Sequence, residues 1–132
     1  SLGRKLHLRV SDVMHHGDQV ATVAAHASMD EVVVKSTQKM LGVVLVVDGP
    51  KLLGIITDGD LRRALQHREK FFQFKAEEVM TRKPVTASPE MMAQAALELM
   101  ENRPSQIMVL PVTDGNGHWK GVVRVHDLVS AF

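Results

Sequence analysis

The sequence predicts an α/β (α+β) fold built from two copies of one unit with the element order β-α-β-β-α. The first observation is an internal repeat. Gly54-Ile55-Ile56 recurs as Gly121-Val122-Val123, 67 positions later, and Asp60-Leu61 recurs as Asp127-Leu128 at the same spacing. The second observation is that each half has a helix-like stretch followed by an apolar run. One copy alone leaves a sheet half-covered, so we expect the copies to pack sheet against sheet as a pseudo-two-fold pair.

The first half opens with a helix signal at Ser28. The Ser28 hydroxyl can accept from the third backbone N–H of a helix, while Glu31 reaches back to close a capping box. We expect this helix to end near Leu41-Gly42, because glycine suits the turn that follows a helix. Residues 43–47 form a continuous run of Val and Leu, which is typical of a strand buried on both faces.

A hairpin and a final helix complete each half. Asp48-Gly49-Pro50 is turn chemistry, residues 51–56 form the returning strand, and Asp58 is expected to cap a helix starting near Gly59. The second half predicts the same order: a helix over 89–102, a strand over 107–111, a turn over 114–117, a strand over 119–125 and a helix over 126–131.

The composition excludes several classes of protein. The 16 basic and 15 acidic residues leave a net charge of +1, so neither a nucleic acid nor a membrane surface is an expected partner. The chain has no cysteine, which excludes disulfides and thiol nucleophiles. No apolar run approaches the ~20 residues that span a bilayer, and a cytoplasmic protein fits best. His15 and His16 are adjacent and point apart, so we predict no metal site and no cofactor.

The repeated strings resemble a pair of CBS (cystathionine-β-synthase-type) domains. The resemblance rests on the order of elements, on Val13-Met14 and its repeat Val79-Met80, and on the motif formed by Gly54, Thr57 and Asp60. It covers residues 10–131. It implies tandem CBS domains over residues 10–70 and 71–132, with two ligand clefts.

In the resembled family the motif Thr contacts a phosphate and the motif Asp accepts both ribose hydroxyls. The resemblance gives these roles to Thr57 and Asp60, although both residue types also commonly cap helices and that alternative stays open. In the second motif Arg124 replaces the Thr. Arg124 could pair with a phosphate or carboxylate, or could be a surface arginine lying over a strand. Asp127 keeps a ribose role, with His126 beside it.

The rest of each pocket is expected from the segment before the first helix and from the start of the next strand. A shift of 64 positions aligns Thr22 with Thr86 and Val43 with Ile107. These four residues are candidates to supply backbone groups and an apolar slot for a base. Thr22 and Thr86 could equally be ordinary strand residues.

The amino-acid sequence in and around these motifs is also similar to the C-terminal half of arabinose-5-phosphate isomerases. The similar strings are Gly3-Arg4-Lys5-Leu6, residues 8–15 and Thr57-Asp58-Gly59-Asp60-Leu61-Arg62-Arg63. The resemblance implies that residues 1–9 are a linker from a missing N-terminal sugar-isomerase domain of an enzyme that feeds synthesis of Kdo, an acidic sugar of bacterial lipopolysaccharide. We therefore expect this chain to bind and regulate rather than to catalyse.

Several ligands and roles remain open at this point. CMP-Kdo, the activated end product, carries a ribose, a phosphate and a carboxylate, and is one candidate ligand. An AMP- or ATP-sensing CBS regulator is another possibility, and a structural module that joins a homo-oligomer without any ligand is a third. The Phe71-Phe72-Gln73-Phe74 cluster between the copies could dock a partner domain or fold onto its own domain.

Overall fold

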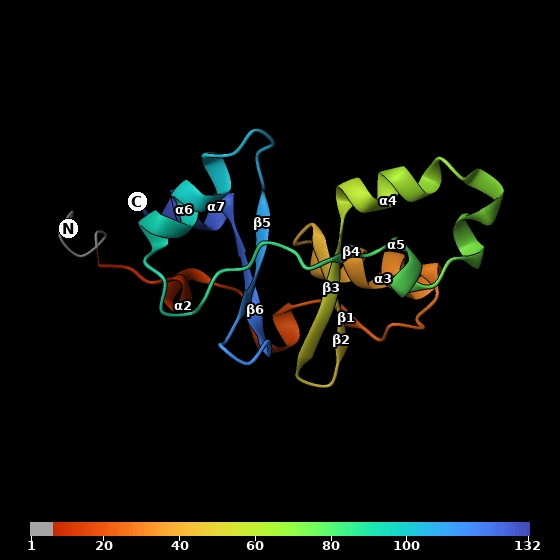
Figure 1. Ribbon diagram of the computed structural model, residues 1–132, viewed down its shortest axis with the longest axis horizontal. Helices are drawn as coiled ribbons and strands as arrows, with labels where there is room; N and C mark the ends of the chain where they lie inside the picture. Colours follow the sequence, from red (N-terminus) through yellow and green to blue (C-terminus); the bar gives the residue numbers. More distant parts are fainter. Residues whose placement is uncertain (1–6) are drawn as a thin grey trace. The chain divides into compact units, whose positions relative to one another are not determined.

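The computed structural model describes residues 7–132, so residues 1–6 of the predicted linker lie outside the described part. The described chain forms two compact units. The first unit comprises Asp18–Pro84, and the second comprises the residues up to Gly17 together with Val85–Phe132 (Figure 1). Each unit combines strands and helices, which confirms the predicted α/β class with two β-α-β-β-α repeats.

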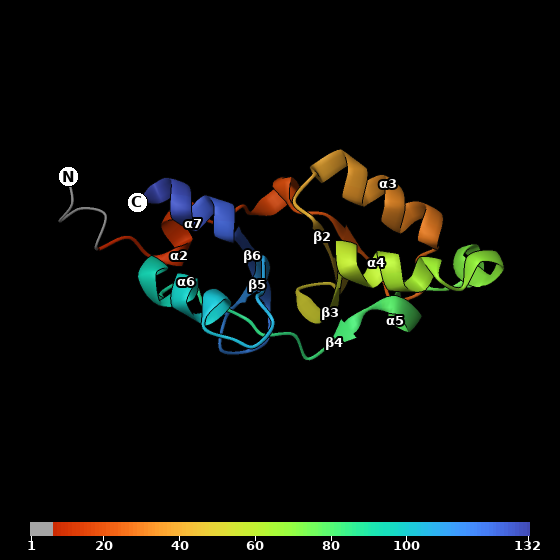
Figure 2. The same cartoon turned by 90° about the horizontal axis from the view of Figure 1, so that it is seen from above.

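The first unit has a four-stranded sheet with the order β1-β2-β3-β4. Strands β1 and β2 are parallel, and the other neighbours are antiparallel. Figure 2 shows that α3, α4 and α5 all lie on one face of this sheet. The elements are β1 (Thr22–Val23), α3 (Met29–Lys39), β2 (Val43–Asp48), β3 (Lys51–Thr57), α4 (Asp58–Leu65), the 3-10 helix η2 (Arg68–Gln73), α5 (Ala76–Val79) and β4 (Thr81–Arg82).

The second unit has an antiparallel pair of strands covered on one face by three helices (Figure 2). Its first predicted strand is reduced to one parallel bridge between Ala87 and Val112. The elements are α2 (Val10–Val13), α6 (Ala93–Glu101), β5 (Val109–Thr113), β6 (Trp119–Arg124) and α7 (Val125–Ala131), and the 3-10 helix η1 (Gly17–Gln19) spans the boundary between the units.

The two units do not coincide with the two sequence repeats. The segment Val13-Met14-His15, near the start of the first repeat, belongs to the second unit, and Val79-Met80-Thr81, near the start of the second repeat, belongs to the first. We call these two stretches the lead-in segments. The backbone of His15 exchanges two hydrogen bonds with Val122, at 2.8 and 2.9 Å, and Thr81 on β4 is the antiparallel partner of Ile55 on β3. Each core is thus completed by the lead-in segment of the other repeat.

A glycine makes each of these close approaches possible. A Cβ on Gly54 would lie 2.7 Å from the carbonyl oxygen of Thr81 and 2.7 Å from the sulfur of Met80. A Cβ on Gly121 would overlap the carbonyl oxygen of His15. The repeated glycine of the motif is therefore required by packing, because any side chain would push the lead-in segment away from the strand.

The structure corrects several predicted element ends in the first unit. The cap at Ser28 is confirmed, since its hydroxyl accepts from Glu31 N at 3.2 Å, but the reciprocal half of the capping box is not formed. Helix α3 ends at Lys39, and Met40, in a left-handed conformation (φ 58°), takes the terminal position predicted for glycine. Helix α4 is capped by Thr57, one residue before the predicted Asp58.

Two corrections fall in the second unit. Strand β5 begins at Val109 instead of Ile107, and α6 begins at Ala93 instead of residue 89. The later start of β5 reflects a longer loop, which follows α6 in the second unit. Val109 lies opposite Arg124, as Val43 lies opposite Thr57. The structural counterpart of Val43 is therefore Val109, and the predicted alignment of Val43 with Ile107 is wrong by two residues.

The Phe cluster mostly folds onto its own unit. Phe71 is 3% exposed in the core of the first unit, and Phe74 packs against the same core. Phe72 is 63% exposed and meets Phe71 edge-on, with ring centroids 4.9 Å apart. Within residues 7–132, no helix is long and apolar enough to cross a membrane, and the same residues contain no group of three or more His, Asp or Glu side chains suited to a metal ion.

Candidate functional site

Asp60 is the buried polar side chain of the first motif. It is 6% exposed and sits in the first turn of α4, where Thr57 caps the helix. Its Oδ2 accepts from Thr57 N at 2.9 Å and from Thr57 Oγ1 at 3.1 Å. Thr81 Oγ1 donates to both carboxylate oxygens, at 3.0 and 3.2 Å, and the Arg63 guanidinium pairs with Oδ1. The carboxylate is therefore saturated by groups of its own unit.

Asp127 occupies the matching position in the second motif. Its Oδ2 accepts from Arg124 N at 2.9 Å and from Arg124 Nε at 3.1 Å. Its Oδ1 accepts from Arg124 Nη2 at 2.8 Å and from His15 Nε2 at 3.0 Å. Because a carboxylate cannot donate, the bond to Asp127 forms only with the His15 tautomer that carries its proton on Nε2, and in that tautomer Nε2 does not accept from Arg124 Nη2, 3.4 Å away. Arg124 thus binds Asp127 through two side-chain nitrogens and its backbone.

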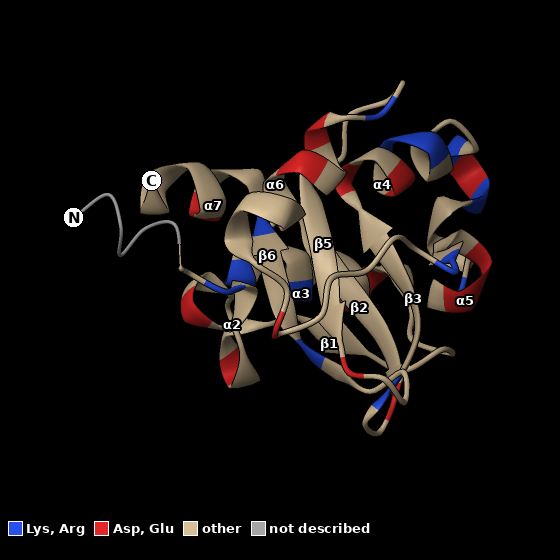
Figure 3. Ribbon diagram, turned by 60° about the vertical axis from the view of Figure 1, so that its left-hand side comes forward, with Lys and Arg blue, Asp and Glu red and all other residues tan. Residues whose placement is uncertain are grey.

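The two aspartates share a backbone geometry but differ in the source of their positive charge. In the first motif the cation is Arg63, three residues after Asp60, with a side chain 68% exposed. In the second motif the cation is Arg124, at the capping position itself, with a side chain only 28% exposed. Figure 3 shows the acidic start and the basic end of α4 in the first unit.

These contacts set the electrostatics of the second motif. Burial raises the pKa of Asp127, but hydrogen bonds from the side chain and backbone of Arg124 and from His15 outweigh burial, so the net pKa lies below its ordinary value. The hydrogen bond to Asp127 in turn raises the pKa of Arg124. Both groups are therefore charged at neutral pH and stabilise one another.

The remaining predicted site residues are spread along the units. Val43 is buried and pairs with Thr57. Ile107 lies before β5 and packs against the core of the second unit. Thr22 on β1 pairs with Leu45 on β2. His126 is exposed on α7. Thr86 is half-buried, directly before the bridge residue Ala87.

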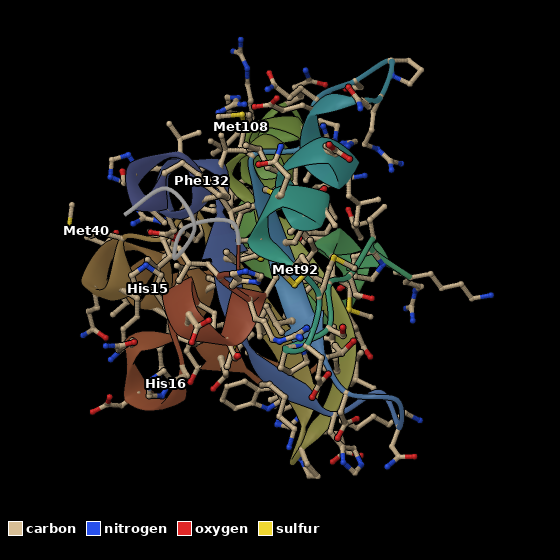
Figure 4. All side chains as sticks on the ribbon, turned by 90° about the vertical axis from the view of Figure 1, so that its left-hand side faces the viewer. His15, His16, Met40, Met92, Met108 and Phe132 are labelled. Atoms are coloured by element: carbon tan, nitrogen blue, oxygen red, sulfur yellow. The ribbon has the colours of Figure 1, made fainter. Side chains whose placement is uncertain are left out.

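Sequence reasoning missed His15 and Thr81, the two lead-in residues that bond the motif aspartates. Both follow a repeated Val-Met pair, so Val13-Met14-His15 and Val79-Met80-Thr81 carried a usable signal. In Figure 4 the neighbouring His16 projects away from His15, and His16 is exposed. The sequence repeat therefore includes a polar residue after each Val-Met pair, but only the fold shows that this residue bonds to a motif aspartate.

The first unit also has an open pocket of about 650 Å³. It lies beside the start of α3 and the turn between β2 and β3, with Asp48, Glu31 and Lys75 in its lining. Strand β2 has Val43 opposite Thr57 at one end and Asp48 opposite Lys51 at the other. The pocket is therefore at the hairpin end of the sheet, away from Asp60, and Thr22 is its one predicted site residue among the described lining.

The fold and the duplicated motif define a tandem pair of small α/β domains. The CBS domain model matches residues 10–67 and 76–132, and the chain belongs to the CBS domain family. Among curated proteins it is similar to the arabinose 5-phosphate isomerase KdsD of Yersinia pestis, with 41% identity over 99% of this chain and 39% of that protein. The chain therefore spans about two fifths of the length of this relative.

Solved structures share the fold. The CBS domain pair of protein MJ0100, in complex with 5′-methylthioadenosine and S-adenosyl-L-methionine, is 26% identical with a TM-score of 0.79, covering 93% of this chain and 94% of that one. CBSX2 in complex with AMP is 22% identical, also with a TM-score of 0.79, over 93% of this chain and 94% of that one. The predicted CBS pair is thereby confirmed.

Proposed function

We propose that this CBS pair is the regulatory module of an arabinose 5-phosphate isomerase and that it binds a ligand with a ribose and a phosphate. The proposal is supported by 41% identity to KdsD along nearly the whole chain, in a relative more than twice as long. The catalytic domain would belong to the rest of the longer protein, which we place in the cytoplasm. The chain itself would bind and couple, since a ligand regulates only through different affinities for two states of the enzyme.

The chemistry of the neighbour's ligands supports a ribose. Both 5′-methylthioadenosine and S-adenosyl-L-methionine, bound to the CBS pair of MJ0100, contain a ribose diol. A carboxylate accepts two hydroxyl hydrogen bonds in a charge-assisted arrangement. We assign this role to Asp60, the buried acidic residue of the first motif.

The observation that carries the proposal is that two of the groups bonded to Asp60 are exposed to solvent. Arg63 is mostly exposed and Thr81 lies on an exposed edge strand, so water can take over both groups when a diol replaces them. Thr57 Oγ1 now donates to Asp60, and turning that hydroxyl would direct its proton to a phosphate. Asp60 would keep the Thr57 backbone N–H throughout.

CMP-Kdo is the specific ligand that we propose. Its cytidylate supplies the ribose and the phosphate, and the Kdo carboxylate would require a cation. Val43 and Thr22 in the first unit, and Thr86, Ile107 and His126 in the second, stay predicted contacts. Arg124 and Asp127 correspond to Thr57 and Asp60 of the first motif. At a second site, a ribose diol would have to replace the present side-chain partners of Asp127.

Isothermal titration of this chain with CMP-Kdo, AMP and ATP tests the proposal. We expect saturable binding of CMP-Kdo that Asp60→Asn weakens at least ~10-fold, because hydrogen bonds to a charged group contribute about 1.5–3 kcal/mol. Asp58→Asn is the matched control, since Asp58 is exposed in the same helical turn. Absence of binding heat for every nucleotide at low salt would contradict the proposal, and preference for AMP or ATP would change the ligand.

A structural module without a ligand is the second candidate, favoured by the saturation of Asp60 by its own unit. In that case the pair would join copies of the isomerase into a homo-oligomer. No nucleotide would shift the melting temperature, and Asp60→Ala would leave the native mass unchanged. A nucleotide-dependent rise in melting temperature excludes this candidate.

A further inference from the structure

The two motifs hold their aspartates with the same backbone bond. Thr57 N donates to Asp60 Oδ2 at 2.9 Å, and Arg124 N donates to Asp127 Oδ2 at 2.9 Å. Both aspartates occupy the third position of a helix. Any difference in ligand binding between the motifs must therefore come from the side chains around each carboxylate.

The side chains differ in how firmly they hold the carboxylate. Arg63 reaches Asp60 through one nitrogen, and its side chain is 68% exposed. Arg124 reaches both oxygens of Asp127 through two nitrogens, and its side chain is 28% exposed. A bidentate, partly desolvated pair is harder to break than a solvated one-point contact, because each separated charge must find new partners.

His15 adds a further constraint to the second motif. Its ring lies 3.0 Å from Asp127 Oδ1 and is held by a lead-in segment whose backbone pairs with Val122. The counterpart in the first motif is Thr81, a small hydroxyl on the exposed strand β4. Freeing Asp127 would thus require Arg124 and His15 to move together.

We infer that only the first motif accepts a ribose diol, because Arg124 and His15 already occupy Asp127 in the way that a ligand would. Each chain then binds one nucleotide, through Asp60. This inference rests on the proposed function and specifies which of its two candidate sites is used. Arg124 is the residue that determines this difference, since it stands where the first motif has Thr57.

Titration calorimetry with CMP and AMP as probes tests the inference through the number of bound equivalents. The unmodified chain is expected to bind one equivalent, and Asp60→Asn is expected to abolish that binding. The double variant Arg124→Thr/His15→Thr copies Thr57 and Thr81 into the second motif. It is expected to bind two equivalents, with circular dichroism confirming that it is folded.

A reverse graft keeps the test decisive if that double variant does not fold. Thr57→Arg/Thr81→His copies the second motif into the first, and it is expected to reduce binding from one equivalent to none. Two equivalents in the unmodified chain, or one equivalent that survives Asp60→Asn, would overturn the inference and leave the proposed function intact. Absence of binding by the unmodified chain and by the folded Arg124→Thr/His15→Thr variant would overturn both.

Discussion

Thr81 Oγ1 donates to both carboxylate oxygens of Asp60, at 3.0 and 3.2 Å, across 21 positions of the chain. Thr81 lies three residues before Pro84, where the first unit ends. His15, which bonds Asp127, lies two residues before Gly17, where the second unit's first segment ends. Both motif aspartates are thus bonded to a residue close to a connection between the units.

Thr81→Val tests the strength of this link in the ligand-free protein. The substitution keeps the shape of the side chain but removes a donor to a charged carboxylate, and we expect the free energy of unfolding to fall by about 1.5–3 kcal/mol. Urea unfolding at pH 7 measures it. Thr37→Val is the matched control on the exposed side of α3 and is expected to change stability by only about 0.5 kcal/mol. Equal effects of the two substitutions would show that the hydroxyl on Asp60 contributes nothing.

Gly54→Ala and Gly121→Ala should each separate a lead-in segment from its strand. The added methyl group meets the backbone oxygen of Thr81 or of His15, and neither can move without breaking the pairing of the segment. We expect each variant to lose about 1–3 kcal/mol in urea unfolding.

Gly115→Ala is the control for these two variants. A Cβ at Gly115 meets nothing within 4 Å, so its effect should stay within about 1 kcal/mol of zero. If Gly54→Ala and Gly121→Ala behaved like Gly115→Ala, the requirement for glycine at the lead-in contacts would be wrong.

The sequence was sufficient for the repeat, the hairpins and the helix at Ser28, because these features depend on local turn residues and short periodicities. It was insufficient for the cap of α4, where Thr57 and Asp58 are neighbours and either residue type can cap. It also misplaced the start of β5, since the longer loop of the second repeat changes the spacing without changing the pattern.

The side chains around the aspartates were the least predictable part of the site. His15 and Asp127 are separated by 112 positions, and only the packing of a lead-in segment onto the other repeat brings them together. The sequence marks Arg124 as a replacement for Thr but does not identify Asp127 as its partner. An internal ion pair and a ligand contact call for the same residue types, so the sequence pattern alone does not distinguish them.

Asp127 should make the stability depend on pH in the acid range. Its pKa is lower in the folded protein than in the unfolded chain, because the bonds from Arg124 and His15 outweigh the effect of burial. The unfolded chain therefore takes up the proton more readily. The stabilisation is present above the ordinary carboxyl pKa of about 3.9 and is lost as the pH falls through the folded-state value.

Asp127→Asn isolates this contribution. At pH 7 the variant should be less stable by about 1–3 kcal/mol, and the difference from the unmodified chain should shrink below pH 4. Urea unfolding between pH 7 and pH 3 measures the difference directly. Asp114, whose pKa is lowered chiefly by the backbone N–H of His118, contributes in the same range and is present in both proteins. A difference that stayed constant with pH would contradict the assignment.

Met40→Gly should stabilise the protein. Met40 ends α3 with φ 58° and ψ 33°, a left-handed conformation that costs a side-chain-bearing residue about 1–2 kcal/mol relative to glycine. The side chain is 79% exposed and projects from the ribbon (Figure 4), so its removal exposes little core. We expect a gain of about 1 kcal/mol in urea unfolding. Lys39→Gly, one residue earlier and still helical, should instead lose about 1 kcal/mol. Changes of opposite sign in the free energy of unfolding at Met40 and Lys39 would confirm that α3 ends between them. A loss of stability at both positions would show that the Met40 side chain makes a stabilising contact that outweighs the cost of its backbone conformation.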